Sequence, residues 1–253
     1  MPLETCQMPR KGHTMAQNRT DVPGAGRIAA GPANPRSLLF EDSLLPTLNT
    51  AVLLGLLTLD MVLIILHIAA GATFEQIPVL LNIAFDYSLG EFFGYAKWLA
   101  IIVMLLIVSR RTANPALLAC AAIFAMMLAD DSLQIHETLG KVAVNADRVG
   151  GTSWATGQTI GEIAVWIVMI GLLLPVIVLG LLKSTRAQWP AAFRFLGLIA
   201  LFAVFGGLID ALHMPVQNLP FGPQLADLLE DGGEMVVASV IVAHAAVLLR
   251  ATE

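Results

Sequence analysis

Six runs of apolar residues, each interrupted by few charges, dominate this sequence. They cover residues 45–70, 91–109, 115–136, 158–182, 192–213 and 228–249. A helix of about 20 residues spans the roughly 30 Å hydrocarbon layer of a bilayer. Hydrophobic residues make up 57% of the chain and charged residues 13%, whereas a soluble domain is roughly 25% charged. The sequence therefore predicts an all-α membrane bundle of six transmembrane helices, with the lipid bilayer as its surroundings.

The polar segments between these runs predict the domain organisation. Residues 1–45 are rich in Pro, Gly, Asn and Arg and too poor in large apolar residues to form a core, so we expect a disordered tail. Residues 46–253 form the predicted transmembrane domain. Residues 71–90 predict an interfacial helix or a re-entrant turn, and residues 141–157 a loop. We expect Pro215, Pro220 and Pro223 to break the chain between the last two helices, and we expect no cleavable signal peptide.

The distribution of basic residues predicts the orientation in the membrane, because short loops rich in Lys and Arg stay in the cytoplasm. The chain has 14 basic residues. Only Lys97, Lys141 and Arg148 fall on the side opposite the termini. We therefore predict a protein that crosses the membrane six times, with both termini in the cytoplasm.

Acidic residues gather on the other, outward side in this topology. Thirteen of the 19 carboxylates fall there: Glu75, Asp86, Glu91, Asp130, Asp131, Glu137, Asp147, Glu162, Asp210, Asp227, Glu230, Asp231 and Glu234. Ionisable groups at the rim of a membrane span are costly unless they have a partner. Such a cluster either becomes neutral through raised pKa values or binds a cation.

The densest part of this cluster is the segment A-D-D-S-L-Q-I-H-E-T-L-G at residues 129–140. On a continuous helix, Asp130, Gln134 and Glu137 would share one face, and Asp131 and His136 would flank it. Several carboxylates should be stabilised by the dipole at a helix N-terminus, namely Glu91, Glu162, Glu230, Asp231 and Glu234. Four others should lie near helix C-termini, where the dipole disfavours them and another partner is needed: Asp130, Asp131, Glu137 and Asp210.

A divalent metal ion is one predicted partner for these acids. Asp210 and His213 are three residues apart, as are Asp231 and Glu234, so each pair can project from one helix face. The predicted ligands are Asp130, Asp131, His136, Glu137, Asp210, His213, Glu230 and Glu234, with Glu91 and Glu162 behind them. Oxygen ligands favour Mg, Ca or Mn, and added imidazoles favour Zn or Fe. The alternative is a carboxylate network that shares protons.

Two further polar residues lie deeper in the predicted spans. Asp60 falls near the middle of the first span, where it either relays protons or pairs with a Ser, Thr or Lys of a neighbouring helix. His244 lies in the inner half of the last span. Together they could continue a proton path inward from the acidic rim.

Two motifs carry a resemblance to a known class of protein. D-D-S-L-Q-I-H-E at residues 130–137 and L-E-D-G-G-E at residues 229–234 resemble the acidic helix ends of small uncharacterised bacterial polytopic membrane proteins. The resemblance implies a bacterial inner-membrane location and paired acidic motifs, and it carries no activity.

Three functions remain open from the sequence. One is an outward-facing pocket that binds a divalent cation, as in a metal-dependent hydrolase of a lipid or small substrate. The second is a proton- or cation-coupled transporter that uses Asp60 and the acidic rim. The third is a non-catalytic membrane subunit or sensor. No basic, aromatic-rich surface indicates a nucleic acid partner.

Overall fold

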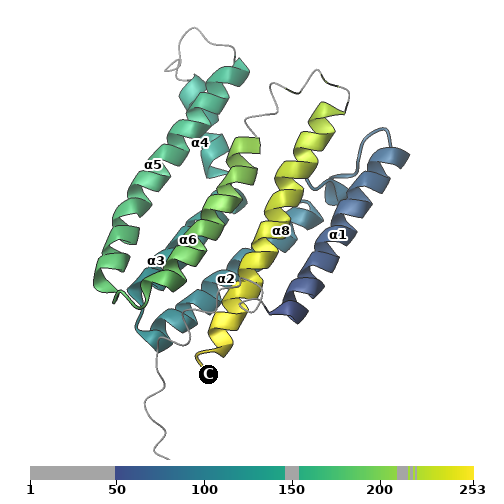
Figure 1. Cartoon of the computed structure of the whole chain (residues 1–253). Coiled ribbons are helices and arrows are strands. Elements are labelled where there is room, and N and C mark those ends of the chain that lie inside the picture. The colour runs from purple at the N-terminus through teal and green to yellow at the C-terminus, as the bar shows by residue number, and fades with distance from the viewer. Residues whose placement is uncertain (1–48, 146–153, 210–215, 217–218, 220) are drawn as a thin grey trace, which may run out of the picture. The chain divides into compact units, whose positions relative to one another are not determined.

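A computed structural model describes residues 49–145, 154–209, 216, 219 and 221–253. All of the regular secondary structure in these residues is helical, and they contain no strand. The elements are α1 (Thr50–Thr73), η2 (Val79–Leu81), α2 (Leu89–Thr112), α3 (Pro115–Leu133), α4 (Ile135–Asn145), α5 (Trp154–Lys183), α6 (Trp189–Ala203), η3 (Val204–Ile209) and α8 (Gly222–Arg250). Within the described residues, six helices are long and apolar enough to cross a membrane, which confirms the predicted fold class of an all-α membrane bundle (Figure 1).

Local signals in the sequence explain where several helices begin. The side chains of Asn49, Ser88 and Asn114 each accept a hydrogen bond from a backbone N–H in the first turn of α1, α2 and α3. Such caps satisfy donors that have no partner within the helix. Pro115 occupies the first turn of α3, where no N–H is needed. These side chains therefore set the start of three of the spans.

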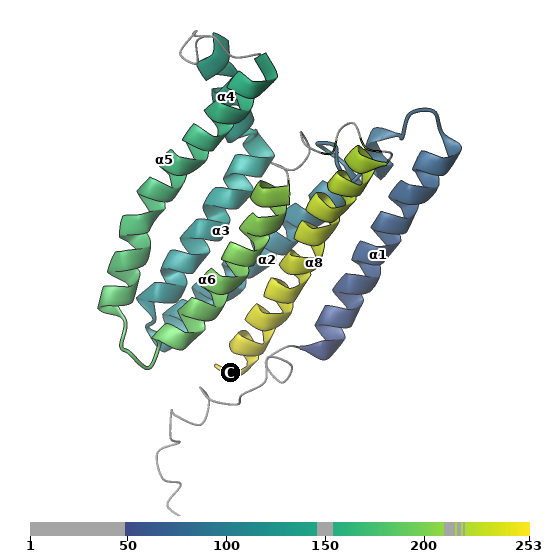
Figure 2. The ribbon, with the colours of Figure 1, turned by 45° about the horizontal axis from the view of Figure 1, so that its top comes forward.

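The helices pack around α2, α3 and α8 (Figure 2). α8 contacts α1, α2 and α6, α2 packs along α3, and α5 packs against α3 and α4. Large apolar side chains of these helices meet in the core, among them Ile101, Leu105, Phe124, Phe195 and Ile241. Close packing of this kind holds membrane helices together, because lipid tails are as apolar as the side chains themselves.

The first helix has an unusual distribution of side chains. Within α1, the buried residues are Asp60, His67 and Ala70, whereas Leu54 and Ile65 are 59% and 58% exposed. In water this arrangement would be unstable, but in lipid the exposed apolar side chains meet hydrocarbon. α1 therefore turns Asp60 and His67 toward the other helices and large apolar residues such as Leu54 and Ile65 outward.

The segment around residue 134 differs from the predicted continuous helix. α3 ends at Leu133, and Gln134 has a left-handed backbone with φ 49°. A new helix, α4, begins at Ile135 and extends into the segment that we predicted to be a loop. Asp130 and Glu137 therefore belong to different helices, and the prediction that they share one helix face was wrong.

The last two spans also differ from their predicted boundaries. α6 continues into the π-helix η3, and the predicted end of this span at Asp210 to His213 lies outside the described residues. α8 begins at Gly222, earlier than predicted, and Pro223 lies in its first turn instead of breaking the chain. A proline is tolerated there because the first turn has no internal N–H bond to lose. Pro215 and Pro220 lie outside the described residues.

These boundaries change which acids lie at helix N-termini. Glu91 lies in the first turn of α2, as predicted, and Glu137 lies in the first turn of α4 rather than near a C-terminus. The first turns of α5 and α8 carry no acid. The predicted positions were therefore wrong for Glu137 and for four acids that lie deeper in α5 and α8: Glu162, Glu230, Asp231 and Glu234.

Candidate functional site

A buried ion pair joins the first two spans. Lys97 Nζ of α2 donates a hydrogen bond to Asp60 Oδ1 of α1 over 2.5 Å, and the two side chains are 1% and 0% exposed. Ser239 Oγ of α8 donates to the other oxygen, Asp60 Oδ2, also over 2.5 Å. Both carboxylate oxygens of Asp60 are thus satisfied by side chains of two other helices. The structure shows the pairing alternative that the sequence left open for this residue.

The ammonium group of Lys97 is held by further contacts. It donates to the backbone carbonyl of Met235 in α8 over 2.9 Å and lies 4.2 Å from the ring centroid of Phe93. An ammonium over an aromatic face is attracted by the ring quadrupole, more strongly when water is excluded. Lys97 is therefore a buried, paired residue within α2, so it should not have been counted as a charge of the side opposite the termini.

A cavity of about 80 Å³ lies between α2, α3, α8 and the end of α6. Four carboxylates line it: Glu91, Asp131, Asp231 and Glu234. Three aromatic side chains also line it: Tyr95, Trp98 and Phe202. Met235, whose carbonyl accepts the bond from Lys97, belongs to the same wall. The cavity and the buried ion pair are therefore adjacent.

Two carboxylates of the cavity differ in how they are held. Glu91 accepts hydrogen bonds from the Tyr95 hydroxyl and from the backbone N–H of Tyr87, which fix both of its oxygens. Among the described residues, none donates a hydrogen bond to the carboxylate of Asp131, which is only partly exposed. A partly buried carboxylate favours a positively charged or hydrogen-bonding partner. Of these two carboxylates, Glu91 is fixed by its hydrogen bonds, and Asp131 is able to bind a ligand.

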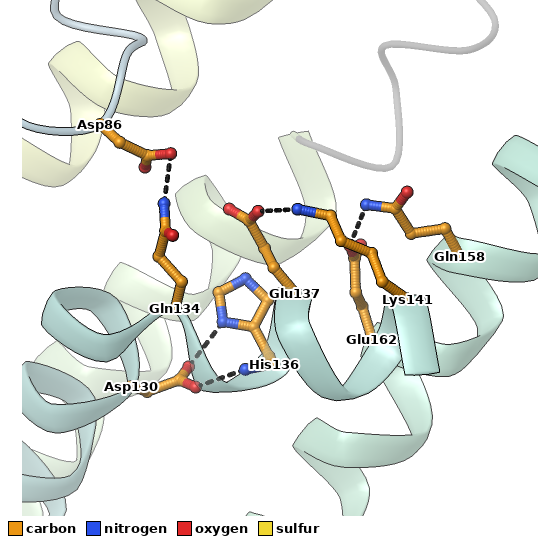
Figure 3. Close-up of polar contacts among 8 residues, drawn as sticks. All are labelled: Asp86, Asp130, Gln134, His136, Glu137, Lys141, Gln158 and Glu162. Atoms are coloured by element: carbon orange, nitrogen blue, oxygen red, sulfur yellow. Dashed lines mark hydrogen bonds and ion pairs between the residues drawn. The ribbon is translucent and has the colours of Figure 1, made fainter. Parts of the chain in front are cut away.

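The neighbouring Asp130 binds the start of α4 (Figure 3). Its Oδ1 accepts the backbone N–H of His136 over 3.0 Å, and its Oδ2 lies 2.9 Å from His136 Nδ1. Asp130 is 0% exposed, and the imidazole packs against Trp166 with ring centroids 5.6 Å apart. The N-terminus of α4 is the partner that the sequence argument required for this carboxylate, because N–H groups and the helix dipole both favour an anion there.

The charge of Asp130 also affects the protonation of His136. Burial, the largest influence, lowers the pKa of the imidazole, whereas the hydrogen bond and the negative charge of Asp130 raise it. The charges of Glu137 and Glu162 act in the same direction as Asp130, so the net pKa of His136 is raised. When it is protonated, the imidazole beside the buried carboxylate links α3 to α4 electrostatically.

The remaining acids at this end of the bundle form separate pairs (Figure 3). Gln134 donates to Asp86, Lys141 Nζ donates to Glu137 Oε2 over 2.8 Å, and Gln158 donates to Glu162 Oε1 over 2.8 Å. Burial and the charge of Glu137 raise the pKa of Asp86, and the contact with Glu137 raises the pKa of Lys141.

These contacts divide the predicted metal ligands into several places. Asp130 and His136 bind each other, Glu137 binds Lys141, and Asp131 and Glu234 line the cavity. Glu230 lies on α8 and is not part of the cavity lining. Within the described ranges, no three His, Cys, Asp or Glu side chains are grouped so that they could hold a metal ion. Asp210 and His213 lie outside those ranges, so metal binding stays a prediction.

The two buried histidines lie in different surroundings. His244 packs on Phe195 of α6, with ring centroids 4.9 Å apart. It is five residues from Ser239, which places it about 140° around α8 from the face that meets Asp60. His67 lies on α1 seven residues from Asp60, and its buried Nδ1 has no hydrogen-bond partner. His67 therefore shares the helix face of Asp60, whereas His244 faces another helix.

Sequence reasoning missed the residues that join this site together. Lys97 and Ser239 hold Asp60, and Tyr95 and Trp98 line the cavity. The available signal was the presence of a lysine inside an apolar span, because a charged residue there needs a buried partner. Which residue supplies that partner depends on how three helices pack.

The family comparison covers most of the chain. A family model described as "Domain of unknown function (DUF8692)" matches residues 47–250. The chain belongs to the DUF8692 family. The matched region begins just before α1 and ends at the last residue of α8, so it contains all six candidate spans of this DUF8692 protein. No curated protein and no solved structure matches the chain.

Proposed function

We propose that this multi-pass membrane protein is a transporter that couples the movement of a small cation to the movement of a proton. The cation occupies the carboxylate-lined cavity, and Asp60 with Lys97 carries the proton. The observation that supports the proposal most strongly is the hydrogen bond from Lys97 to the carbonyl of Met235, a residue of the cavity wall.

The position of the ion pair supports a functional role. Asp60, Lys97 and Ser239 come from three different spans and meet at a place with 0–2% exposure. Burying an ion pair costs desolvation energy that its attraction often fails to recover, so a pair of apolar residues would hold the helices at least as well. Ionisable residues inside membrane spans typically mark ion or proton pathways. The pair is therefore better explained by proton transfer than by stability.

Electrostatic repulsion gives the coupling. A cation in the cavity lies next to the wall that binds the Lys97 ammonium, in a region of low dielectric where like charges interact strongly. Lys97 then has to release a proton or move away from Met235. Conversely, a proton on Asp60 removes the negative charge that holds Lys97. Cation entry and proton release are thereby linked.

The helix beside the cavity has a geometry suited to movement. η3 continues α6 as a π-helix from Val204 to Ile209, and α8 packs against it. Gly206 of η3 faces the Glu234 carboxylate, and Gly233 of α8 faces the Phe205 ring, where an added Cβ would collide with either neighbour. π-helical segments occur frequently at functional sites. The close contact of η3 with α8 provides a place where a small shift would open or close the cavity.

Proton flux measurements in proteoliposomes test this proposal. Vesicles that contain the full chain and an internal pH dye are exposed to a concentration jump of Na⁺, K⁺, Mg²⁺ or tetramethylammonium, none of which crosses lipid as a neutral base. We expect at least one cation to change the internal pH beyond the change in protein-free vesicles. Asp60→Asn should abolish this change, because the amide cannot accept the proton.

A matched control uses a carboxylate outside the cavity. Glu75→Gln changes an exposed acid between α1 and η2 and should retain the wild-type flux. Full flux in Asp60→Asn, or no cation-dependent flux in the wild type, would overturn the proposed function. A pH change with Mg²⁺ that persists in Asp60→Asn would likewise overturn the role of Asp60 as the proton carrier.

A further inference from the structure

The lining of the cavity narrows the class of cation that it binds. Acids alone suit many cations, but here aromatic side chains share the wall with the carboxylates. Tyr95 and Trp98 come from α2, and Phe202 comes from the end of α6. Aromatic faces attract organic cations, especially where water is excluded. They contribute no ligand to a Mg²⁺ or Ca²⁺ ion, which binds through oxygen atoms.

The aromatic side of the cavity is rigid. The indole of Trp98 is 3% exposed and packs edge-on against Phe202, with ring centroids 4.6 Å apart and an interplanar angle of 73°. Phe124 also packs against the indole, with ring centroids 5.5 Å apart. Because both neighbours hold the indole, the surface that it presents to the cavity is preformed, which lowers the ordering cost of binding.

The acidic side of the cavity has a free acceptor. Glu91 is fixed by Tyr95 and by the backbone of Tyr87, so its role is to supply negative charge. The partly buried carboxylate of Asp131 receives no hydrogen bond from the described residues. An ammonium N–H would supply that bond, and charge-assisted bonds of this type are roughly twice as strong as neutral ones.

The size of the cavity limits the ligand to a few heavy atoms. One water molecule needs about 10–15 Å³ of such volume, so the cavity of about 80 Å³ has room for only a small molecule. Gly94 also lines it, and a Cβ added there would meet nothing within 4 Å. The space beside Gly94 is therefore open to a ligand.

We propose that the cavity between α2, α3, α6 and α8 binds a small organic ammonium ion, with the charge at Asp131 and the carbon groups against Trp98. This inference rests on the proposed function, for which it names the class of transported cation. Its test is separate from the flux measurement, because binding can be measured in detergent without a membrane.

Calorimetry on the full chain in detergent tests the inference. Methylammonium and tetramethylammonium chloride are titrated at constant ionic strength, with NaCl, MgCl₂ and CaCl₂ as competing probes. We expect one or both ammonium ions to bind with one site per chain. Asp131→Asn should weaken the binding of methylammonium, which carries N–H donors, about tenfold or more, because a hydrogen bond to a charged group is lost.

A pair of glycine substitutions provides a test that leaves every charge in place. Gly94→Leu fills the cavity and should abolish ammonium binding. Gly55→Leu, in an exposed part of α1 where an added Cβ also meets nothing within 4 Å, should leave binding unchanged. Thermal unfolding of each variant verifies that it folds. Unchanged ammonium affinity in folded Gly94→Leu would overturn the inference, as would binding of divalent ions only.

The two proposals fail in different ways. Asp60→Asn should still bind ammonium in detergent, because Asp60 lies outside the cavity lining, although it should lose proton flux. Cation-dependent flux without ammonium binding would overturn the ligand class and leave the transporter proposal standing. Ammonium binding without any flux in the wild type would overturn the transporter proposal and leave the ligand class standing.

Discussion

The backbones of Gly140 in α4 and Gly161 in α5 lie directly against each other. A Cβ added to Gly161 would stand 2.8 Å from the carbonyl oxygen and 2.9 Å from the Cα of Gly140. Neither atom can move without shifting the helix, since both belong to the backbone. Small residues at such crossings allow membrane helices to approach closely. The pair therefore fixes how α4 docks on α5.

This contact predicts the effect of a single methyl group. Gly161→Ala should destabilise the protein by about 1–3 kcal/mol, as other overpacked sites do. Gly171→Ala on the same helix is the control, because its Cβ would meet nothing within 4 Å, and it should be neutral or slightly stabilising. Thermal unfolding in detergent measures both. Equal midpoints for the two variants would show that the α4–α5 crossing is not close.

The buried ion pair predicts a strongly non-additive mutant cycle. Asp60→Asn and Lys97→Met should each lower the free energy of unfolding, with about 3–5 kcal/mol expected where one charge is left buried alone. The double variant should recover most of that loss, because it leaves no isolated charge. Unfolding of all four proteins in one lipid or detergent gives the coupling energy. If the double variant lost as much free energy of unfolding as the two single variants together, Asp60 and Lys97 would not be paired.

His136 predicts a pH dependence of stability. Its pKa in the folded protein is raised above the unfolded value of about 6.5, so the folded state binds the proton more tightly. The stabilisation is fully present below the unfolded pKa and is lost as the pH rises through the folded pKa. Wild-type stability relative to His136→Gln should therefore decline from pH 6 upward. Asp130→Asn should flatten that decline, and a decline that it leaves intact would point to another group.

A polar contact at the opposite end of the bundle predicts a smaller effect. Ser184 Oγ donates to Asn114 Oδ1 over 3.0 Å and accepts the backbone N–H of Ala116 over 3.0 Å. Ser184→Ala should cost about 1–3 kcal/mol, because it removes a partner from buried polar groups. Thr58→Ala on α1, whose hydroxyl bonds its own helix in an exposed turn, is the control and should change the unfolding midpoint little.

The sequence predicted the number and approximate place of the spans because each depends on one local property. A run of apolar residues inserts into lipid as a helix whatever its neighbours are, since its backbone hydrogen bonds are satisfied within the run. Helix boundaries were less accurate. The break at Gln134 was missed, because it depends on a tertiary contact. The Asp130 side chain accepts the N–H of His136 and so caps the start of α4.

The residues of the site also could be only partly predicted from the sequence. The excess of carboxylates at one end of the spans is a property of the sequence, as is the presence of Asp60 and Lys97 in apolar runs. Tertiary packing decided that Asp60 binds Lys97 and Ser239, that Asp130 binds His136, and that Asp131 faces a cavity with Trp98. Burial makes a charge require a partner, but only the packing of α1, α2, α3 and α8 determines which residue is within reach.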